Sequence, residues 1–419
     1  MKKIDITITN NNQNKLLSQN SDFVLKTIYD KNNKTLLTKE ELIYLYDVFN
    51  EHINRPISEI IIIDEIISTR NIYEDMATIF DCKASEVTCN CRDVISNPDK
   101  YVVLLSDFEI KSSEEVQSIN GITSRLKYIS GSSSDFHDIS HGIQFNHSIF
   151  ISNVIAIGGY LSCFMSKKVY LPHLKTVRYD FTMNYACDVS SLTSLEHVGG
   201  KFKAPRLKKS KGLNNLRHVG SLHLKSLEEA NDLSNLEIID TDIELGIKGS
   251  QGLDKLRYIG TDAYFAPLVD ASGLISLEYI GRTAGFDSLT DANGLNSLKY
   301  IGGHAYFNKL TNASSLTNLV YIGRDANFEN LKKASGLDNL IYIGERACFN
   351  SLIDAHGLSN LRIIGYAAFF DSLVSTDGLQ NIRYIDLLCK NNNTKLSDAD
   401  YDKVKTRKLV LPYYRDSIK

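Results

Sequence analysis

The sequence contains no tryptophan, only six prolines and four methionines, and no apolar run long enough to cross a membrane. Its densest apolar segment, IIIIDEII at residues 60–67, is interrupted by two charges, whereas a membrane-spanning helix needs about 20 apolar residues. The amino-terminal stretch MKKIDITITNNNQNK lacks the apolar core of a secretory signal. We therefore expect a cytoplasmic protein with no membrane partner.

The cysteines provide no disulfide framework. Their number is odd and their spacing does not repeat, so a reducing compartment is expected. The seven residues are Cys82, Cys89, Cys91, Cys163, Cys187, Cys348 and Cys389.

Known catalytic signatures are also missing. The chain has no nucleophile elbow, P-loop, HExxH, GxGxxG or pair of catalytic carboxylates. The string DFHDISHGIQFNH places His137, His141 and His147 close together, and such a group can bind zinc, but the spacing matches no established motif. We expect no enzymatic activity, no metal and no cofactor.

The charge is unevenly distributed over an ordinary globular composition. The 419 residues are 43% hydrophobic and carry a net charge of −3. Residues 1–100 have 12 Lys/Arg against 16 Asp/Glu, a net of −4. Residues 165–225 have 12 Lys/Arg against three acidic residues, a net of +9. A local basic surface can therefore exist although the whole chain is weakly acidic.

A 21-residue unit repeats through the second half of the chain. One unit reads GLNSLKYIGGHAYFNKLTNAS, from Gly294 to Ser314. The last apolar residue of GLxxL recurs from Leu195 to Ile382 in steps of 21, 20, 20 and then 21 six times. A fixed period in the twenties predicts a solenoid, in which stacked coils bury one continuous core.

Two small-residue columns constrain the shape of each coil. The glycine of the YIG element occupies the same slot in six successive units, which predicts a corner with positive φ or a close backbone approach. The alanine slot that contains Ala305 is also constant and predicts a tight interior. The glycines are Gly260, Gly281, Gly302, Gly323, Gly344 and Gly365.

The repeat resembles those of leucine-rich-repeat proteins. Its GLxxLxYIG and IGxxA-F elements, as in IGERACF (343–349) and IGYAAFF (364–370), are similar to bacterial repeats of the BspA or Treponema type and to receptor L-domain coils. The similarity is strong over residues 174–385 and weak over 101–173. The usual cysteine slot holds leucine instead, and the usual Ile-Pro is missing. The resemblance implies a bacterial leucine-rich-repeat solenoid.

The remaining segments are predicted to flank this solenoid. Residues 1–100 are predicted to form a small α+β domain, 101–173 degenerate repeats, 174–385 the regular β-rich coils and 386–419 a carboxyl-terminal cap. Within the first domain, Ile4, Ile6 and Ile8 alternate as in a strand, and residues 23–29 and 35–37 are predicted to form a hairpin. Thr38 and Glu41 form a capping box for a helix, and a second helix is expected over residues 58–69.

Residues 70–94 have the rhythm of a helix-turn-helix motif. Met76, Ala77 and Phe80 would end its first helix, and Ala84 to Asp93 would form the second. Such a helix can enter a DNA groove. The acidic charge of the domain argues against that function, because DNA binding depends on neutralising phosphates.

Two columns that follow the closing leucine are the candidate protein-binding surface. The first column carries either charge and so should face solvent; it includes Arg257, Lys299 and Arg362. The second column should stack as a ladder of tyrosines. These are Tyr258, Tyr279, Tyr300, Tyr321 and Tyr342.

The tyrosines have two interpretations at this point: a recognition strip, or an aromatic stack that seals the core edge. A third, variable column ends at Phe369, and with Val320, Ile341 and Cys348 this residue is expected to form an apolar patch.

The basic segment supplies a second candidate surface, for nucleic acid or an acidic partner. It has no interleaved aromatic residues and no base-reading motif, so a solvated basic face is the alternative. Its residues are Lys201, Lys203, Arg206, Lys208, Lys209, Lys211 and Arg217.

These patterns favour a non-enzymatic scaffold that binds a partner protein through the face of the solenoid. Two alternatives stay open: a nucleic-acid-associated regulator that uses residues 165–225, and a factor that inhibits an enzyme by blocking it.

Overall fold

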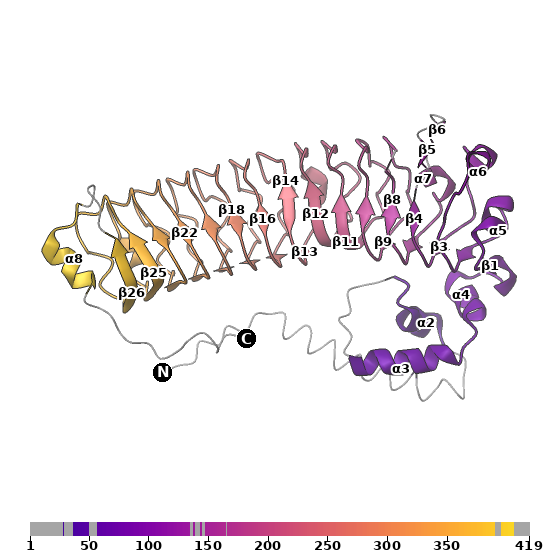
Figure 1. Cartoon of the computed structure of the whole chain (residues 1–419), viewed down its shortest axis with the longest axis horizontal. Helices are drawn as coiled ribbons and strands as arrows, with labels where there is room; N and C mark the ends of the chain where they lie inside the picture. Colours follow the sequence, from indigo (N-terminus) through magenta and orange to yellow (C-terminus); the bar gives the residue numbers. More distant parts are fainter. Residues whose placement is uncertain are drawn as a thin grey trace.

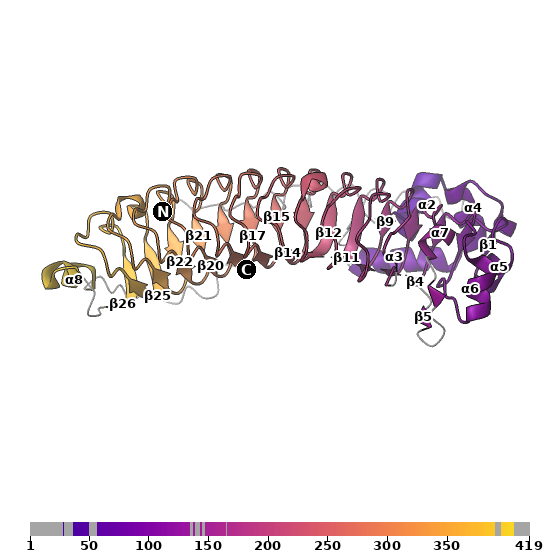
Figure 2. The ribbon, with the colours of Figure 1, turned by 90° about the horizontal axis from the view of Figure 1, so that it is seen from above.

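The computed structural model describes residues 28, 37–49, 57–134, 137–138, 143–144, 147–164, 166–389 and 395–405. These residues form an elongated parallel β-solenoid (Figure 1). Helices gather at its amino-terminal end, and one helix covers its carboxyl-terminal end, as the view from above also shows (Figure 2). The predicted fold class, an α+β amino-terminal part followed by a β-rich solenoid of 21-residue coils, is therefore confirmed.

Each coil adds a short strand to a first ladder, in which all neighbours pair in parallel. In order along the body the strands are β1 (Val87–Thr88), β2 (Val103–Leu104), β3 (Tyr128–Ile129), β7 (Ala156–Ile157), β9 (Thr176–Val177), β11 (His197–Lys203), β12 (His218–Leu224), β13 (Ile238–Ile239), β15 (Tyr258–Ile259), β17 (Tyr279–Ile280), β19 (Tyr300–Ile301), β21 (Tyr321–Ile322), β23 (Tyr342–Ile343), β25 (Ile363–Phe369) and β26 (Tyr384–Cys389).

A second parallel ladder runs beside the first, and the long strands β11, β12, β25 and β26 take part in both. Its other strands are β4 (Ser133–Ser134), β8 (Leu161–Ser162), β10 (Phe181–Thr182), β14 (Ile243–Leu245), β16 (Ala263–Tyr264), β18 (Ala284–Gly285), β20 (Ala305–Tyr306), β22 (Ala326–Asn327) and β24 (Ala347–Cys348). Strands β5 (His137–Asp138) and β6 (Ile143–Gln144) form a separate antiparallel pair.

The pairing register reproduces the sequence repeat. Tyr279 pairs with Tyr300, and Tyr300 pairs with Tyr321, so one 21-residue unit is one coil. The leucine, isoleucine, alanine and phenylalanine slots are fully buried, and they join into one core along the body. Phe286 and Phe307 stack within it, with ring centroids 5.2 Å apart. No coil could bury these side chains alone, which is why the repeats must stack.

The constant glycine of YIG is explained by the close approach of neighbouring coils. A Cβ atom at Gly302 would lie 2.0 Å from the carbonyl oxygen of Gly281, so no side chain fits there. Positive φ occurs at a different glycine, the first residue of GLxxL, with 97° at both Gly294 and Gly336. Of the two predicted reasons for the YIG glycine, close approach is the one that applies.

A column of asparagines ties successive coils together. The side-chain Nδ2 atoms of Asn318, Asn339 and Asn360 each donate to a backbone carbonyl of the preceding coil, all at 2.6 Å. These bonds satisfy carbonyl groups in the turn before the first ladder, where the backbone has no strand partner.

The amino-terminal helices pack against the first coils. They are α2 (Lys39–Tyr46), α3 (Ile57–Ser68), α4 (Ile72–Phe80), α5 (Cys91–Ser96) and α6 (Ser113–Ile119). The predicted capping box at Thr38 and Glu41 is present, and α3 matches the helix expected over 58–69. Ile28 is helical, not part of the predicted hairpin, and the strand predicted at residues 4–8 lies outside the described residues.

The predicted helix-turn-helix motif is wrong. Helix α4 forms as expected, but Ala84–Glu86 is a single 3-10 turn (η1), and Val87–Thr88 is strand β1. Helix α5 begins only after Asn90, whose side chain caps it. The β-branched Val87 and Thr88 pair with β2 instead of continuing a helix, so no recognition helix spans Ala84 to Asp93.

Both ends of the ladder extend past the regular repeats. The first ladder starts at Val87, within the segment expected to be a separate domain, and ends at Cys389. Helix α8 (Asp398–Lys405) packs against β26 and buries Val404. Short elements complete the chain: α7 (His147–Phe150), η2 (Asn231–Leu233) and η3 (His356–Leu358). Among the described helices, none has both the length and the apolar character needed to cross a membrane.

Candidate partner-binding surface

The five tyrosines of the first ladder form an uninterrupted stack. Successive ring centroids lie 4.8, 4.9, 4.6 and 4.7 Å apart, and the ring planes are parallel within 4°. In-register parallel strands repeat at about 4.8 Å, so the backbone spacing imposes this stacking distance. The predicted ladder is therefore present, from Tyr258 to Tyr342.

Four of the rings, those of Tyr258, Tyr300, Tyr321 and Tyr342, lean over the glycine of their own coil. The Cε1 atom of Tyr300 is 3.2 Å from the position that a Cβ of Gly302 would occupy, and Tyr321 stands in the same relation to Gly323 at 3.3 Å. The rings thus fill the space that the missing side chains leave. The three inner rings have a tyrosine on each face, and all five side chains are half-buried.

Partial burial also changes the acidity of these phenols. It raises the pKa of all five tyrosines, because the ionised form loses hydration. For Tyr321, burial and the neighbouring phenols Tyr300 and Tyr342 raise the pKa to about 12. The ladder is therefore a neutral, hydroxyl-bearing surface at physiological pH.

The residue immediately before each tyrosine belongs to the column that was expected to face solvent, and its side chains change from charged to apolar and back along the solenoid. In the middle coils its charges pair across coils: Arg257 with Glu237 at 3.3 Å, and Lys299 with Glu278 at 2.6 Å. The next two coils carry half-buried Val320 and Ile341. Arg362 and Arg383 follow, and neither forms an ion pair within the described ranges of the chain.

The same face is covered by helices in the first coils. Val103, Tyr128 and Ala156 hold the ladder position that tyrosines hold later, and all three are buried in a cluster with residues of α2, α3 and α4. Phe80 of α4 stacks on Tyr128 with centroids 5.1 Å apart. Asp47, at the end of α2, forms an ion pair with Arg178 at 3.5 Å. The first ladder thus has a covered part and an open part.

The sequence places Tyr128 and Ile129 in a degenerate repeat unit, and the ladder confirms that position. Sequence reasoning missed that helices cover it. A usable signal was present in the apolar pairs Val103–Leu104 and Tyr128–Ile129, each of which repeats the pattern of the later Tyr-Ile pairs.

The predicted apolar patch divides into two stripes. Phe369 and Cys348 lie next to each other in the second ladder, whereas Val320 and Ile341 flank the first. All four side chains are half-buried. Burial raises the pKa of the Cys348 thiol to about 11, so this residue is a protonated thiol at neutral pH. Only Val320 and Ile341 adjoin the tyrosines.

The basic residues are distributed over several sides of the coils. Arg217 precedes the first-ladder part of β12, Lys201 and Lys203 lie in the second-ladder part of β11, and Lys209 lies in a bridge on another side. Two of the lysines are paired with the following coil: Lys208 with Glu228 at 2.9 Å and Lys209 with Glu229 at 3.3 Å.

Arg206 lies over the ring of Tyr185, 4.3 Å from its centroid. Carboxylates of adjacent coils pair with further lysines of this region, as Asp188 does with Lys168 and Glu196 with Lys175. Lys211 lies in the turn that follows the Lys209 bridge.

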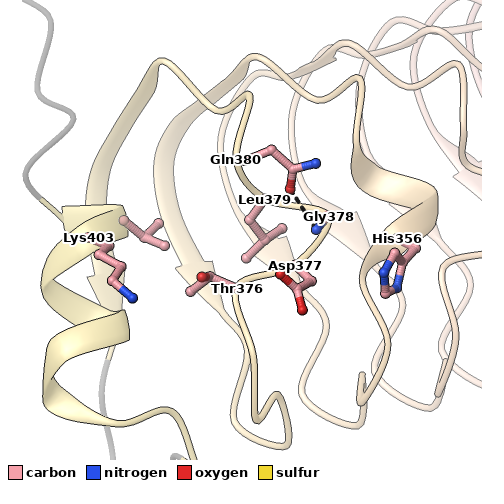
Figure 3. Close-up of a pocket in the computed structure, with 8 residues that line it drawn as sticks. His356, Thr376, Asp377, Gly378, Leu379, Gln380 and Lys403 are labelled. Carbon is pink, nitrogen blue, oxygen red and sulfur yellow. Dashed lines mark hydrogen bonds between the residues drawn. The ribbon is translucent and has the colours of Figure 1, made fainter.

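Two hollows occur at the ends of the body. One, of about 330 Å³, lies between the last coil and α8 (Figure 3). Its polar groups are held internally: Gly378 N–H donates to Gln380 at 2.7 Å, Lys403 Nζ donates to Asp400 at 2.9 Å, and His356 contacts Asp354 at 2.6 Å. These contacts already engage polar atoms of Gly378, Lys403 and His356 within the protein.

The other hollow, of about 420 Å³, is lined by Arg125, Lys127 and Lys175 beside the covered part of the ladder. Arg125 is paired with Glu86 at 3.0 Å, and Lys175 lies 3.8 Å from Glu196. Carboxylates thus already neutralise two of its three cations.

Within the described residues, no three His, Cys, Asp or Glu side chains are grouped to hold a metal ion. His141 and the side chain of His137 lie outside that part, so the zinc hypothesis there is not tested. The seven cysteines lie in the described segments, and none of them is paired in a disulfide there.

Comparison with known proteins does not add a family. No protein-family model matches the chain, and no curated protein matches it. The surface must be interpreted from its own geometry.

Proposed function

We propose that this protein is a non-enzymatic scaffold that binds a partner protein through the first-ladder face of its solenoid. The observation that carries the proposal is the half-exposed tyrosine stack, which continues a face that helices of the same chain already cover. Stacked tyrosines provide a large, rigid contact area whose side chains lose little conformational entropy on binding.

The kind of repeat is part of the same proposal. The GLxxLxYIG consensus and the asparagine column support assignment to the leucine-rich-repeat type, and the fully buried leucine slots fit it. Solenoids of this kind present extended surfaces. The cysteine side chains, which form no disulfide within the described residues, support a cytoplasmic location for the scaffold.

Affinity purification from cells that express the chain naturally tests the proposal. We expect specific proteins to co-purify with the unaltered chain, and the triple reversal Arg257→Glu, Lys299→Glu and Arg362→Glu to lose them. The matched control, Lys208→Glu with Lys209→Glu, reverses paired charges on another side and should retain them. Full retention of every partner by the triple variant would contradict binding through this face.

Nucleic acid is the second candidate partner, through Lys201, Lys203, Arg206, Lys211 and Arg217. The carboxylates that pair with Lys208 and Lys209 weaken this candidate, because they reduce the positive potential that phosphates need. A salt-dependent mobility shift with duplex and single-stranded substrates tests it, and no binding at low salt removes it. An inhibitory role would appear in the first experiment as an enzyme among the captured partners.

A further inference from the structure

The first ladder has one continuous outer face, but its accessibility changes abruptly along the body. The outward position is buried in every coil from Val87 to His197. Val87 is 5% exposed, Thr176 is 7% exposed and His197 is 5% exposed. From His218 to Tyr384 the same position is half-exposed in every coil. Figure 1 shows α2 and α3 alongside the first coils only. The tyrosine stack therefore begins where the helical cover of the face has ended.

The covered part shows how this face is packed. Apolar side chains of α2 and α4 meet the ladder position, as Phe80 does on Tyr128, and Asp47 of α2 reaches Arg178 at the edge. Helices are the usual cover of a parallel sheet, because they satisfy their own backbone hydrogen bonds while presenting an apolar stripe. The open part has the same strand direction and register, and so offers a helix the same geometry.

An extended segment fits this face less well. Added strands bind to a free sheet edge, where unpaired backbone groups are available. Here the backbone N–H groups of Tyr279 and Tyr300 already donate to the preceding coils, and the ladder continues on both sides of them. A partner must therefore bind through side chains packed on the face, not through new strand pairing.

The charged side chains near the carboxyl-terminal end of the solenoid indicate which charge the partner should carry. Val320 and Ile341 widen the apolar surface beside Tyr321 and Tyr342. Arg362 and Arg383 follow on the same side, and within the part of the chain that the structure describes neither is neutralised by an ion pair. An acidic side chain on the partner would complement them, as Asp47 complements Arg178.

We propose that the open part of the first ladder, from Tyr258 to Tyr384, binds an amphipathic helix of a partner protein that has an acidic flank. This proposal rests on the proposed function and names the occupant of its surface. Six coil steps of about 4.8 Å span about 29 Å, which corresponds to a helix of about 19 residues if it follows the body axis.

Site-specific photocrosslinking in the full chain tests the proposal. A benzophenone amino acid replaces Tyr321 in the first ladder or, as a matched control, Tyr306 in the second ladder. The chain is expressed in cells that make it naturally, and the crosslinked segment is sequenced and synthesised as a peptide. We expect a crosslink from position 321 and not from 306, to a segment with apolar residues at helical spacing and acidic residues on one flank.

The synthetic segment is then titrated against the full chain by fluorescence anisotropy. We expect its circular dichroism to show added helix on binding, and a central proline in the peptide to weaken binding at least tenfold. The variant Arg362→Glu with Arg383→Glu should weaken it at least tenfold as well. The control Lys332→Glu with Lys333→Glu should change affinity less than twofold, since Lys333 bridges to Asp354 on another side.

The possible failures are distinguishable. A partner crosslinked from position 306 alone would overturn the helix proposal and leave the scaffold function standing. A segment that binds equally well with the proline, a second copy of this chain or a nucleic acid at position 321 would also overturn it. No crosslink from either position would count against both proposals.

Discussion

Tyr300 and Tyr321 lie face to face, with ring centroids 4.6 Å apart and ring planes 2° from parallel. The two residues occupy the same position in consecutive coils, so the backbone register alone sets their separation. Both faces of each inner ring contact the neighbouring tyrosines of the ladder, so a partner would contact the ring edges and not their faces. The stack therefore contributes to stability as well as presenting a surface.

Removing one ring should weaken the whole body. Tyr321→Ala deletes two stacking contacts and exposes the neighbouring ring faces, so we expect a loss of about 2 kcal/mol in unfolding free energy. Tyr321→Phe keeps the ring and should change stability by less than about 0.5 kcal/mol. Urea denaturation followed by circular dichroism measures both, and equal midpoints for the two variants would show that stacking is unimportant.

The glycine corner should tolerate no side chain. Gly302→Ala places a Cβ 2.0 Å from the Gly281 carbonyl oxygen, so the coils must separate locally. We expect a loss of at least about 3 kcal/mol or failure to fold. The control is Gly285→Ala, in a column where Tyr264 and Tyr306 already carry side chains, and it should cost less than about 1 kcal/mol. Thermal melting of the two variants compares them directly.

Each asparagine of the column should add a similar, small amount to the unfolding free energy. Asn339→Ala removes a 2.6 Å hydrogen bond to the Thr317 carbonyl, and we expect a cost of about 1 kcal/mol. Adding Asn360→Ala should roughly double the loss, because each bond joins a different pair of coils. Asn327→Ala, in the outward column of the second ladder, is the control. Denaturant midpoints no lower than those of this control would contradict a stabilising role.

Alkaline pH should destabilise the ladder. Burial raises the pKa of its five tyrosines in the folded state, so folding favours the neutral phenols. Their stabilisation is complete below about pH 10, the ordinary value, and is lost as pH rises through the folded value, which is about 12 for Tyr321. Ultraviolet titration of tyrosinate should therefore lag in the folded chain relative to the urea-unfolded chain, and Tyr321→Phe should remove one late-titrating group.

The helical cover of the first coils should depend on Asp75. Its buried carboxylate accepts two 2.6 Å hydrogen bonds from Arg70 and one 2.7 Å hydrogen bond from the Tyr46 hydroxyl, which joins α2 and α4 to the turn that follows α3. Asp75→Ala removes the buried carboxylate to which Arg70 and the Tyr46 hydroxyl donate, at a cost of about 3 kcal/mol in unfolding free energy. Hydrogen exchange should then accelerate in α2 to α4 and not in the coils around Tyr300. Asp81→Asn, at the exposed ion pair with Lys39, should have no such effect.

The sequence by itself determined the solenoid. Its 21-residue period gave one coil per repeat, and the constant leucines, Ala305 column and tyrosines were placed correctly, because every coil meets an identical neighbour and one local pattern fixes all pairings. The capping box at Thr38 was equally local, since its donors and acceptors lie within three residues.

Only the tertiary structure showed which distant segments of the chain pack against one another. Val87 and Thr88 form a strand and not a recognition helix, because β2 is there to pair with them, and local sequence does not reveal a partner strand. Lysines that are adjacent in sequence are neutralised by carboxylates about 20 residues away, as Lys208 is by Glu228. The division of one ladder face into a part covered by helices and an open tyrosine part also depends on packing between distant segments. A sequence period predicts contacts that recur in every coil. Contacts that occur once, between distant segments, can be identified only in the folded structure.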